Sequence, residues 1–123
     1  MTDVIIIEKS GNIFKKTTNN IDKIWTLCNY RNNNNFILIL EYKNENYSYE
    51  IFGKEKGRNG SENNFQINLF KNKVYYGNFC CLKKINNKIV NVNLDEFNIV
   101  INGLKNITSK QKPDCELEEE SYL

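Results

Sequence analysis

The sequence contains no histidine and no alanine, and only one proline occurs among its 123 residues. Without histidine, no side chain has an ordinary pKa between 5 and 8, so acid–base catalysis would need another group with a shifted pKa. The acidic residues are scattered, and their closest runs, Asp95-Glu96 and Glu118 to Glu120, are explained by a helix start and a tail. We therefore predict that the protein is not an enzyme and has no catalytic residues.

The four cysteines do not follow a metal-binding pattern. They are Cys28, Cys80, Cys81 and Cys115, with no Cys-x-x-Cys pair and no histidine to complete a mixed ligand set. Adjacent cysteines on a strand point to opposite faces. Two disulfides are compatible with the number of cysteines, but nothing marks the chain as secreted, which favours buried free thiols in a reducing compartment. We predict no metal site and no cofactor.

Long apolar runs are also absent. A membrane-spanning helix needs about 20 consecutive apolar residues, whereas the longest run here is Phe36 to Leu40. The first ten residues lack the basic region and the cleavage site of a signal peptide. We predict a soluble protein without a membrane partner.

Asparagine, by contrast, is abundant. It occurs 23 times, including Asn32 to Asn35, and lysine outnumbers arginine 15 to 2. Asparagine, lysine, isoleucine, tyrosine and phenylalanine have AT-rich codons, whereas alanine has GC-rich ones. The base composition of the genome therefore explains this bias more simply than selection on the protein. An asparagine-rich segment is only a weak indication of a binding site.

The hydrophobic pattern predicts an α+β fold with a mostly antiparallel sheet of about six to seven strands and two short helices. The expected strands are residues 4–8, 12–18, 36–42, 47–52, 65–69, 74–85 and 88–92. A turn is expected at Asn86-Asn87, and Gly77 predicts a bulge or bend in its strand.

Two segments have helical spacing. The first has apolar residues at positions 21, 24, 25 and 28, and Asn19 or Asn20 is expected to cap it. The second is expected to follow a cap at Asn93 and to end at Gly103. Its expected apolar face consists of Leu94, Phe97, Val100 or Ile101, and Leu104.

Charge is divided along the chain. Residues 1–112 carry 17 basic and ten acidic groups, a net charge of +7, whereas residues 113–123 carry five acidic groups. A terminal block of like charge resists compaction. We predict one domain over 1–104 and a disordered tail over 105–123, acidic from position 114. This tail either aids solubility or docks on a partner or on the basic domain, and its candidate binding residues are Glu118, Glu119, Glu120, Tyr122 and Leu123.

The loop from Gly53 to Gly60 is the most suggestive segment for binding. Its glycines would let backbone amides approach a phosphate, and Lys54, Lys56 and Arg58 supply positive charge. It is not a P-loop, because no Gly-Lys-Ser/Thr ending is present and no helix pattern follows. The alternative is an exposed hairpin loop whose glycines adopt positive φ. Lys54, Lys56 and Arg58 are our candidate nucleic-acid-binding residues.

Aromatic residues are numerous on the predicted strands. Aromatic side chains interleaved with lysine can stack on the bases of single-stranded nucleic acid. Strand alternation places Tyr47 and Tyr49 on one face and Phe52 on the other, so at least one of these rows must fill the core. Core packing is the simpler interpretation of these aromatic residues.

Several segments carry a resemblance to a known family. They are Ile5 to Ile13, the stretch Tyr49 to Phe65 with its Phe-Gly-Lys, Gly-Arg and Glu-Asn-Asn-Phe patterns, Leu69, Tyr75 to Asn78, Leu82, and Leu94 to Phe97. In these segments the chain resembles a short conserved protein family of the nucleocytoplasmic large DNA viruses, the giant-virus group. It departs from that family at Asn68 to Lys73, where members are proline-rich, and it is shorter.

The resemblance covers about residues 3–104. It implies a virus-encoded protein with an acidic tail, made in a host cytoplasm, and it assigns no site residue. We therefore predict a non-enzymatic viral accessory or interaction protein that binds nucleic acid or the viral transcription or replication machinery. The alternative is a virion structural or packaged protein that makes protein–protein contacts. The candidate partners of the protein are nucleic acid and a viral or host protein bound through the tail. Its expected location is the host cytoplasm, the viral factory or the virion.

Overall fold

The computed structural model describes residues 1–65 and 73–106. The chain divides into two compact units, of which the first comprises Met1–Phe65 and Val74–Leu94 and the second Gln66–Lys73 and Asp95–Leu123. The first unit holds every described strand, and the second holds most of the α-helix.

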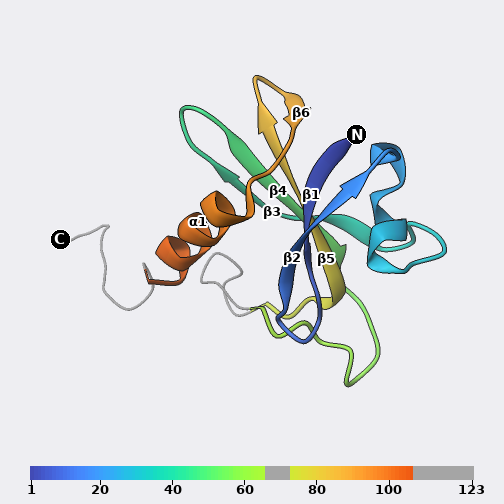
Figure 1. The fold of residues 1–123 in the computed structure, drawn as a ribbon. Helices are drawn as coiled ribbons and strands as arrows, with labels where there is room; N and C mark the ends of the chain where they lie inside the picture. The colour runs from blue at the N-terminus through green and yellow to red at the C-terminus, as the bar shows by residue number, and fades with distance from the viewer. Residues whose placement is uncertain (66–72, 107–123) are drawn as a thin grey trace. The chain divides into compact units, whose positions relative to one another are not determined.

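Six strands and two helices make up the described part of the chain (Figure 1). In order, they are β1 (Thr2–Ile7), β2 (Ile13–Thr18), the 3₁₀ helix η1 (Ile21–Cys28), β3 (Phe36–Lys43), β4 (Ser48–Lys54), β5 (Tyr76–Ile85), β6 (Lys88–Val90) and α1 (Leu94–Asn106). The predicted α+β class is confirmed. The strand expected at 65–69 lies outside the described residues beyond Phe65, as does the acidic tail.

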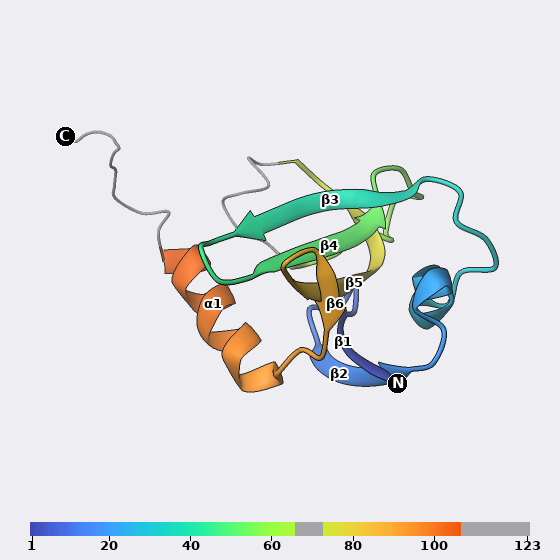
Figure 2. The ribbon, with the colours of Figure 1, turned by 90° about the horizontal axis from the view of Figure 1, so that it is seen from above.

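All strand pairs in the sheet are antiparallel. The strand order is β2-β1-β5-β4-β3, and β6 pairs with the far end of β5. Figure 2 shows β3, β4 and β5 side by side. The register aligns Ile6 of β1 and Phe52 of β4 with Cys80 of β5. β5 is therefore the strand on which the two halves of the sheet meet.

Both faces of the central strands are apolar. Val4 and Ile6 belong to one buried cluster with Cys80, Leu82 and two residues of η1, Ile24 and Cys28. The alternate side chains of the same strands point to the other face, where the ring of Phe79 meets those of Phe65 and Tyr75. Cys80 and Cys81 are both fully buried and point to opposite faces, as the sequence predicted. Full burial of a large apolar side chain such as Ile6 or Phe79 stabilises the fold by about 1.5–3 kcal/mol.

The first helical segment forms a 3₁₀ helix that is interrupted at Lys23, where φ is −126° and ψ is 50°. The predicted capping by Asn19 or Asn20 is wrong, because the N-cap residue, Asn20, forms no side-chain cap hydrogen bond. Instead, the Thr18 hydroxyl oxygen accepts the Asn20 N–H at 3.0 Å. Isolated helices this short are marginal in water, so packing of Ile24 and Cys28 on the sheet is what holds the segment.

The turn at Asn86-Asn87 is confirmed. Both residues have positive φ, 52° and 66°, which is the conformation of a two-residue type I′ hairpin and one that asparagine tolerates. The β3–β4 turn uses a side chain instead: Asn44 Oδ1 accepts the N–H groups of Asn46 and Tyr47. Some of the abundant asparagines therefore have a local conformational role.

The second helix, α1, begins with Asp95 and Glu96 in its first turn, where carboxylates favour the positive end of the helix dipole. The predicted end at Gly103 is wrong, because the helix continues to Asn106. Gly103 does not adopt the positive φ that ends a helix. Glycine inside a helix costs about 1 kcal/mol relative to alanine and need not terminate it. Of the described helices, neither is long and apolar enough to cross a membrane.

A buried asparagine joins three segments of the first unit. Asn63 is only 2% exposed. Its Nδ2 donates hydrogen bonds to the carbonyl oxygens of Ile7 at 3.2 Å and Gly77 at 2.7 Å, and its Oδ1 accepts the Phe65 N–H at 2.7 Å. One amide group thus ties the end of β1 to the start of β5.

We predict that Asn63→Ala lowers the free energy of unfolding by about 2–4 kcal/mol, because each buried backbone group that loses its partner costs about 1–3 kcal/mol. Urea unfolding measures the change. The matched control is Asn64→Ala: Asn64 is exposed and contributes only its backbone N–H, to the Lys9 carbonyl, so a change below about 0.5 kcal/mol is expected. Equal effects of the two substitutions would contradict the assigned role.

Candidate functional site

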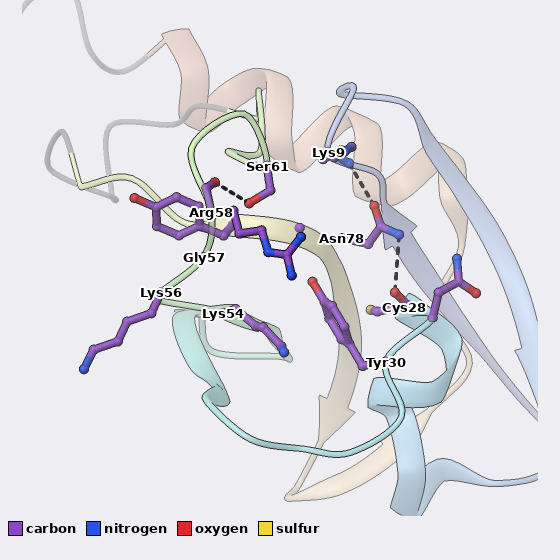
Figure 3. A pocket seen from close by; sticks show the side chains of 12 residues that line it. Lys9, Cys28, Tyr30, Lys54, Lys56, Gly57, Arg58, Ser61 and Asn78 are labelled. Atoms are coloured by element: carbon purple, nitrogen blue, oxygen red, sulfur yellow. Dashed lines mark hydrogen bonds between the residues drawn. The ribbon is translucent and has the colours of Figure 1, made fainter.

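A pocket of about 430 Å³ lies in the first unit, at the end of the sheet where β4 finishes and β5 begins. Its polar and aromatic walls come from the turn after β1, the segment after η1, the loop after β4 and the start of β5 (Figure 3). The side chains of most interest are Lys9, Tyr30, Lys54, Lys56, Arg58 and Tyr76.

Antiparallel register explains why these distant residues meet. Lys54 at the end of β4 is aligned with Tyr76 at the start of β5. Ile7 at the end of β1 is aligned with Phe79 of β5, so the chain beyond Ile7 runs past Asn78 and brings Lys9 to the same edge. The Lys9 N–H donates a hydrogen bond to Asn78 Oδ1 at 3.0 Å.

The three basic residues predicted from the sequence, Lys54, Lys56 and Arg58, all line this pocket. Figure 3 shows the Arg58 guanidinium and the Lys54 ammonium pointing toward Tyr30, whereas the Lys56 side chain extends away from it. The predicted tail residues Glu118, Glu119, Glu120, Tyr122 and Leu123 lie outside the described residues.

Sequence reasoning missed Lys9 and Tyr30. Lys9 follows a strand that was predicted, but only the pairing of that strand with β5 places it here. Tyr30 follows a short irregular helix, and no spacing in the sequence distinguishes it from the other aromatic residues.

Within 1–65 and 73–106, no residue that lines this pocket is acidic, and no carboxylate forms an ion pair with Lys9, Lys54, Lys56 or Arg58. Lys54 Nζ lies 4.2 Å from the centroid of the Tyr30 ring, a cation–π contact worth about 0.5–1 kcal/mol at an exposed site. A concave surface lined by one sign of charge concentrates ligands of the opposite sign.

Two tyrosines pack directly against glycines in the pocket wall. A Cβ on Gly77 would overlap the Tyr30 hydroxyl, and a Cβ on Gly57 would lie 2.7 Å from the Tyr76 side chain. Gly77 also has φ of +70° at the predicted bend of β5. Burial raises the pKa of Tyr30, although a hydrogen bond with the Asn78 backbone opposes this shift. The phenol is therefore neutral near pH 7.

Hydrogen bonds that leave the lysine and arginine side chains unused hold the walls of the pocket together. Asn78 Nδ2 donates to the Cys28 carbonyl at 3.4 Å, which links β5 to the end of η1. The Gly77 N–H donates to the Ser61 carbonyl at 2.8 Å, and the Ser61 hydroxyl donates to the Arg58 carbonyl at 2.7 Å. The Glu62 carboxylate also takes part, since its Oε1 accepts the Gly60 N–H at 2.7 Å, whereas these bonds do not use the side chains of Lys56 and Arg58.

The cysteines of the described region are not suited to nucleophilic chemistry. Cys28, Cys80 and Cys81 are free and buried. Burial raises the pKa of Cys28 to about 12, and it also raises the pKa values of Cys80 and Cys81. The reactive form of cysteine is the thiolate, which these residues do not provide near neutral pH.

In the part of the chain that the structure describes, no three His, Cys, Asp or Glu residues lie close enough together to hold a metal ion.

Most strand aromatics belong to the core, as the simpler interpretation held. Tyr49, Phe65, Tyr75 and Phe79 are buried, and Phe36 and Phe52 pack against the cluster under η1. Of the described tyrosines, Tyr30 and Tyr76 are the two that line the pocket with Lys9, Lys54, Lys56 and Arg58, which we call the basic pocket.

Comparison of the chain with protein families, with curated proteins and with solved structures found no match. The resemblance to the giant-virus family therefore stays a prediction made from the sequence.

We predict that Gly77→Ala is more destabilising than Gly60→Ala. Both glycines have positive φ, but a Cβ on Gly60 would have no atom within 4 Å, whereas one on Gly77 would overlap Tyr30. The left-handed backbone alone costs about 1–2 kcal/mol, and overpacking adds about 1–3 kcal/mol. Urea unfolding of the two variants separates these costs. A Gly77→Ala effect no larger than that of Gly60→Ala would show that the Tyr30 contact is unimportant.

Proposed function

We propose that the protein is a non-enzymatic nucleic-acid-binding protein whose contact site is the basic pocket. The observation that carries the proposal is the convergence of Lys9, Lys54, Lys56 and Arg58 on one pocket without an acidic lining residue among those described. The proposal retains the predicted viral accessory role, including action with a transcription or replication apparatus.

Nucleic acid fits this site better than a generic anion for two reasons. The net charge of +7 over residues 1–112 favours contact of this part of the chain with a polyanion, and the whole chain keeps a positive net charge of +2. Tyr30 and Tyr76 lie among the cations, and tyrosine rings beside positive charge are the combination that binds single strands without sequence preference. The absence of histidine and the raised pKa values of the three buried thiols favour binding without catalysis.

The first test measures binding of a fluorescent single-stranded oligonucleotide by anisotropy, starting at about 50 mM salt. We expect log Kd to rise with log salt concentration with a slope of about 2–3, since each neutralised phosphate on a single strand contributes about 0.7. The triple variant Lys54→Ala/Lys56→Ala/Arg58→Ala should bind at least about ten-fold more weakly, with a slope reduced by about 2.

The matched control is Lys16→Ala/Lys23→Ala/Lys88→Ala, which removes the same charge from exposed residues outside the pocket. It should retain most of the affinity. Equal weakening by the two triple variants would mean that net charge alone drives binding, and no binding by the wild-type chain at low salt would remove the proposal.

A second candidate function, protein–protein contact, is favoured by one observation. β3 is at the end of the strand order, and it exposes Ile37 and Leu38 by 39% and 44%. Apolar residues on an outer strand are a common place for another chain to pair or pack. This reading corresponds to the predicted alternative of a virion structural or packaged protein.

Sedimentation velocity tests that alternative. If β3 mediates contacts between chains, the wild-type protein should sediment as more than a monomer at about 100 μM, a concentration suited to weak association, and Leu38→Lys should shift it toward the monomer. Val74→Lys is the control, because Val74 is similarly exposed at 42% but lies outside the strands. A wild-type protein that is monomeric throughout would argue against self-association through β3.

A further inference from the structure

The basic pocket offers more positive charge than one internal phosphate of a nucleic acid would neutralise. A phosphodiester carries one negative charge, whereas a terminal phosphate monoester carries about −1.5 to −2 at pH 7 and presents three acceptor oxygens. Four basic residues line a pocket of about 430 Å³, which lies within the range of small-molecule sites, and the Lys56 side chain extends outward from it. This concentration of positive charge in a small pocket favours a phosphate monoester over a phosphodiester.

The donor groups are also arranged for a phosphate that enters the pocket. The Arg58 guanidinium and the Lys54 ammonium point toward the ring of Tyr30 (Figure 3), and the guanidinium fork suits two oxygens of one phosphate. The Tyr30 hydroxyl is protonated near neutral pH, so it can donate as well. The segments that carry these side chains are tied to β5 and to each other by the Asn78 side-chain amide and by the hydroxyl and carbonyl groups of Ser61.

The shape of the site distinguishes an end from the middle of a strand. An internal phosphate has nucleotides on both sides, which keep it near the rim of a concave pocket, whereas a terminal phosphate has the strand on one side only and can enter. The rim cations, among them Lys56, whose side chain extends away from Tyr30 in Figure 3, are then free to contact the following phosphates.

We propose, building on the nucleic-acid-binding function above, that the pocket recognises the terminal phosphate monoester of a single strand. Arg58, Lys54 and Tyr30 hold the monoester, while Lys9 and Lys56 contribute charge from the sides. The same chemistry is presented by a 5′-phosphate, by a 3′-phosphate and by a free mononucleotide, and the experiment separates these sources.

The composition of the chain allows the pH dependence of binding to be assigned to the ligand. The second ionisation of a phosphate monoester occurs near pH 6. Because the chain contains no histidine, it has no side chain whose ordinary pKa lies in that region. A preference for the phosphorylated end that weakens between about pH 7 and pH 5.5 would therefore report the charge of the ligand.

The experiment compares one fluorescent single strand of about 12 nucleotides with a hydroxyl at both ends, with a 5′-phosphate and with a 3′-phosphate, by anisotropy. We expect one phosphorylated strand to bind at least about ten-fold more tightly than the hydroxyl strand near pH 7, and this ratio to fall to about three-fold near pH 5.5. Unlabelled adenosine monophosphate serves as a competitor. If adenosine monophosphate displaces the labelled strand as effectively as unlabelled phosphorylated strand does, recognition of the monoester is supported and the free nucleotide is its source.

The variants locate the preference. Lys54→Ala/Arg58→Ala should bring the ratio close to one, whereas the Lys16→Ala/Lys23→Ala/Lys88→Ala control should preserve it. Tyr30→Phe, which removes only the hydroxyl, should lower the ratio by about three-fold.

The outcomes separate this inference from the proposed function. If all strands bind equally and with steep salt dependence, the inference is overturned while nucleic-acid binding stands. If no strand binds, both are overturned. A ratio that survives Lys54→Ala/Arg58→Ala, or one that does not change with pH, would also overturn recognition of the monoester by this pocket.

Discussion

The register of β5 against its neighbours determines where the other features of the first unit lie. β5 pairs with β1 through Phe79 to Cys81 and with β4 from Tyr76 to Lys84. Because all of these pairs are antiparallel, the end of β1, the end of β4 and the start of β5 meet at one edge of the sheet. A shift of one residue would turn Phe79 and Cys81 away from their face of the core. The strand register that builds the core therefore also sets the place of Lys9 and Lys54.

The pocket separates the groups that hold its shape from the groups that carry its charge. Amide and hydroxyl groups of Asn63, Asn78 and Ser61 cross-link its walls. Within the described residues, Lys9 and Arg58 contribute backbone groups to these bonds, and their charged side chains do not take part. Like charges near one another oppose folding, and the neutral hydrogen bonds and the buried apolar faces of the sheet offset that cost. The result is a surface whose positive charge stays available to a ligand.

Glycine has a steric function at this site in addition to its conformational freedom. Gly77 and Gly57 each remove a Cβ that would meet a tyrosine of the pocket. At Gly77 this coincides with the positive φ of the bend in β5. The bend that interrupts the strand is thus the same feature that admits the Tyr30 hydroxyl, so the irregularity of β5 and the aromatic wall of the pocket depend on each other.

Local patterns in the sequence were sufficient for the α+β class, for the alternating strands, for the Asn86-Asn87 turn and for the basic segment from Lys54 to Arg58. These features depend on neighbours close in the chain, through side-chain alternation, backbone conformation and local charge density. The loop was predicted to begin at Gly53, whereas β4 continues to Lys54. The helix cap at Asn20 and the helix end at Gly103 were predicted wrongly, because capping propensity is weak beside the packing of a segment. Only the tertiary structure brings Lys9 and Tyr30 to the basic loop, across 45 and 24 positions to Lys54. Such long-range proximity follows from strand register and core packing, which no local pattern encodes.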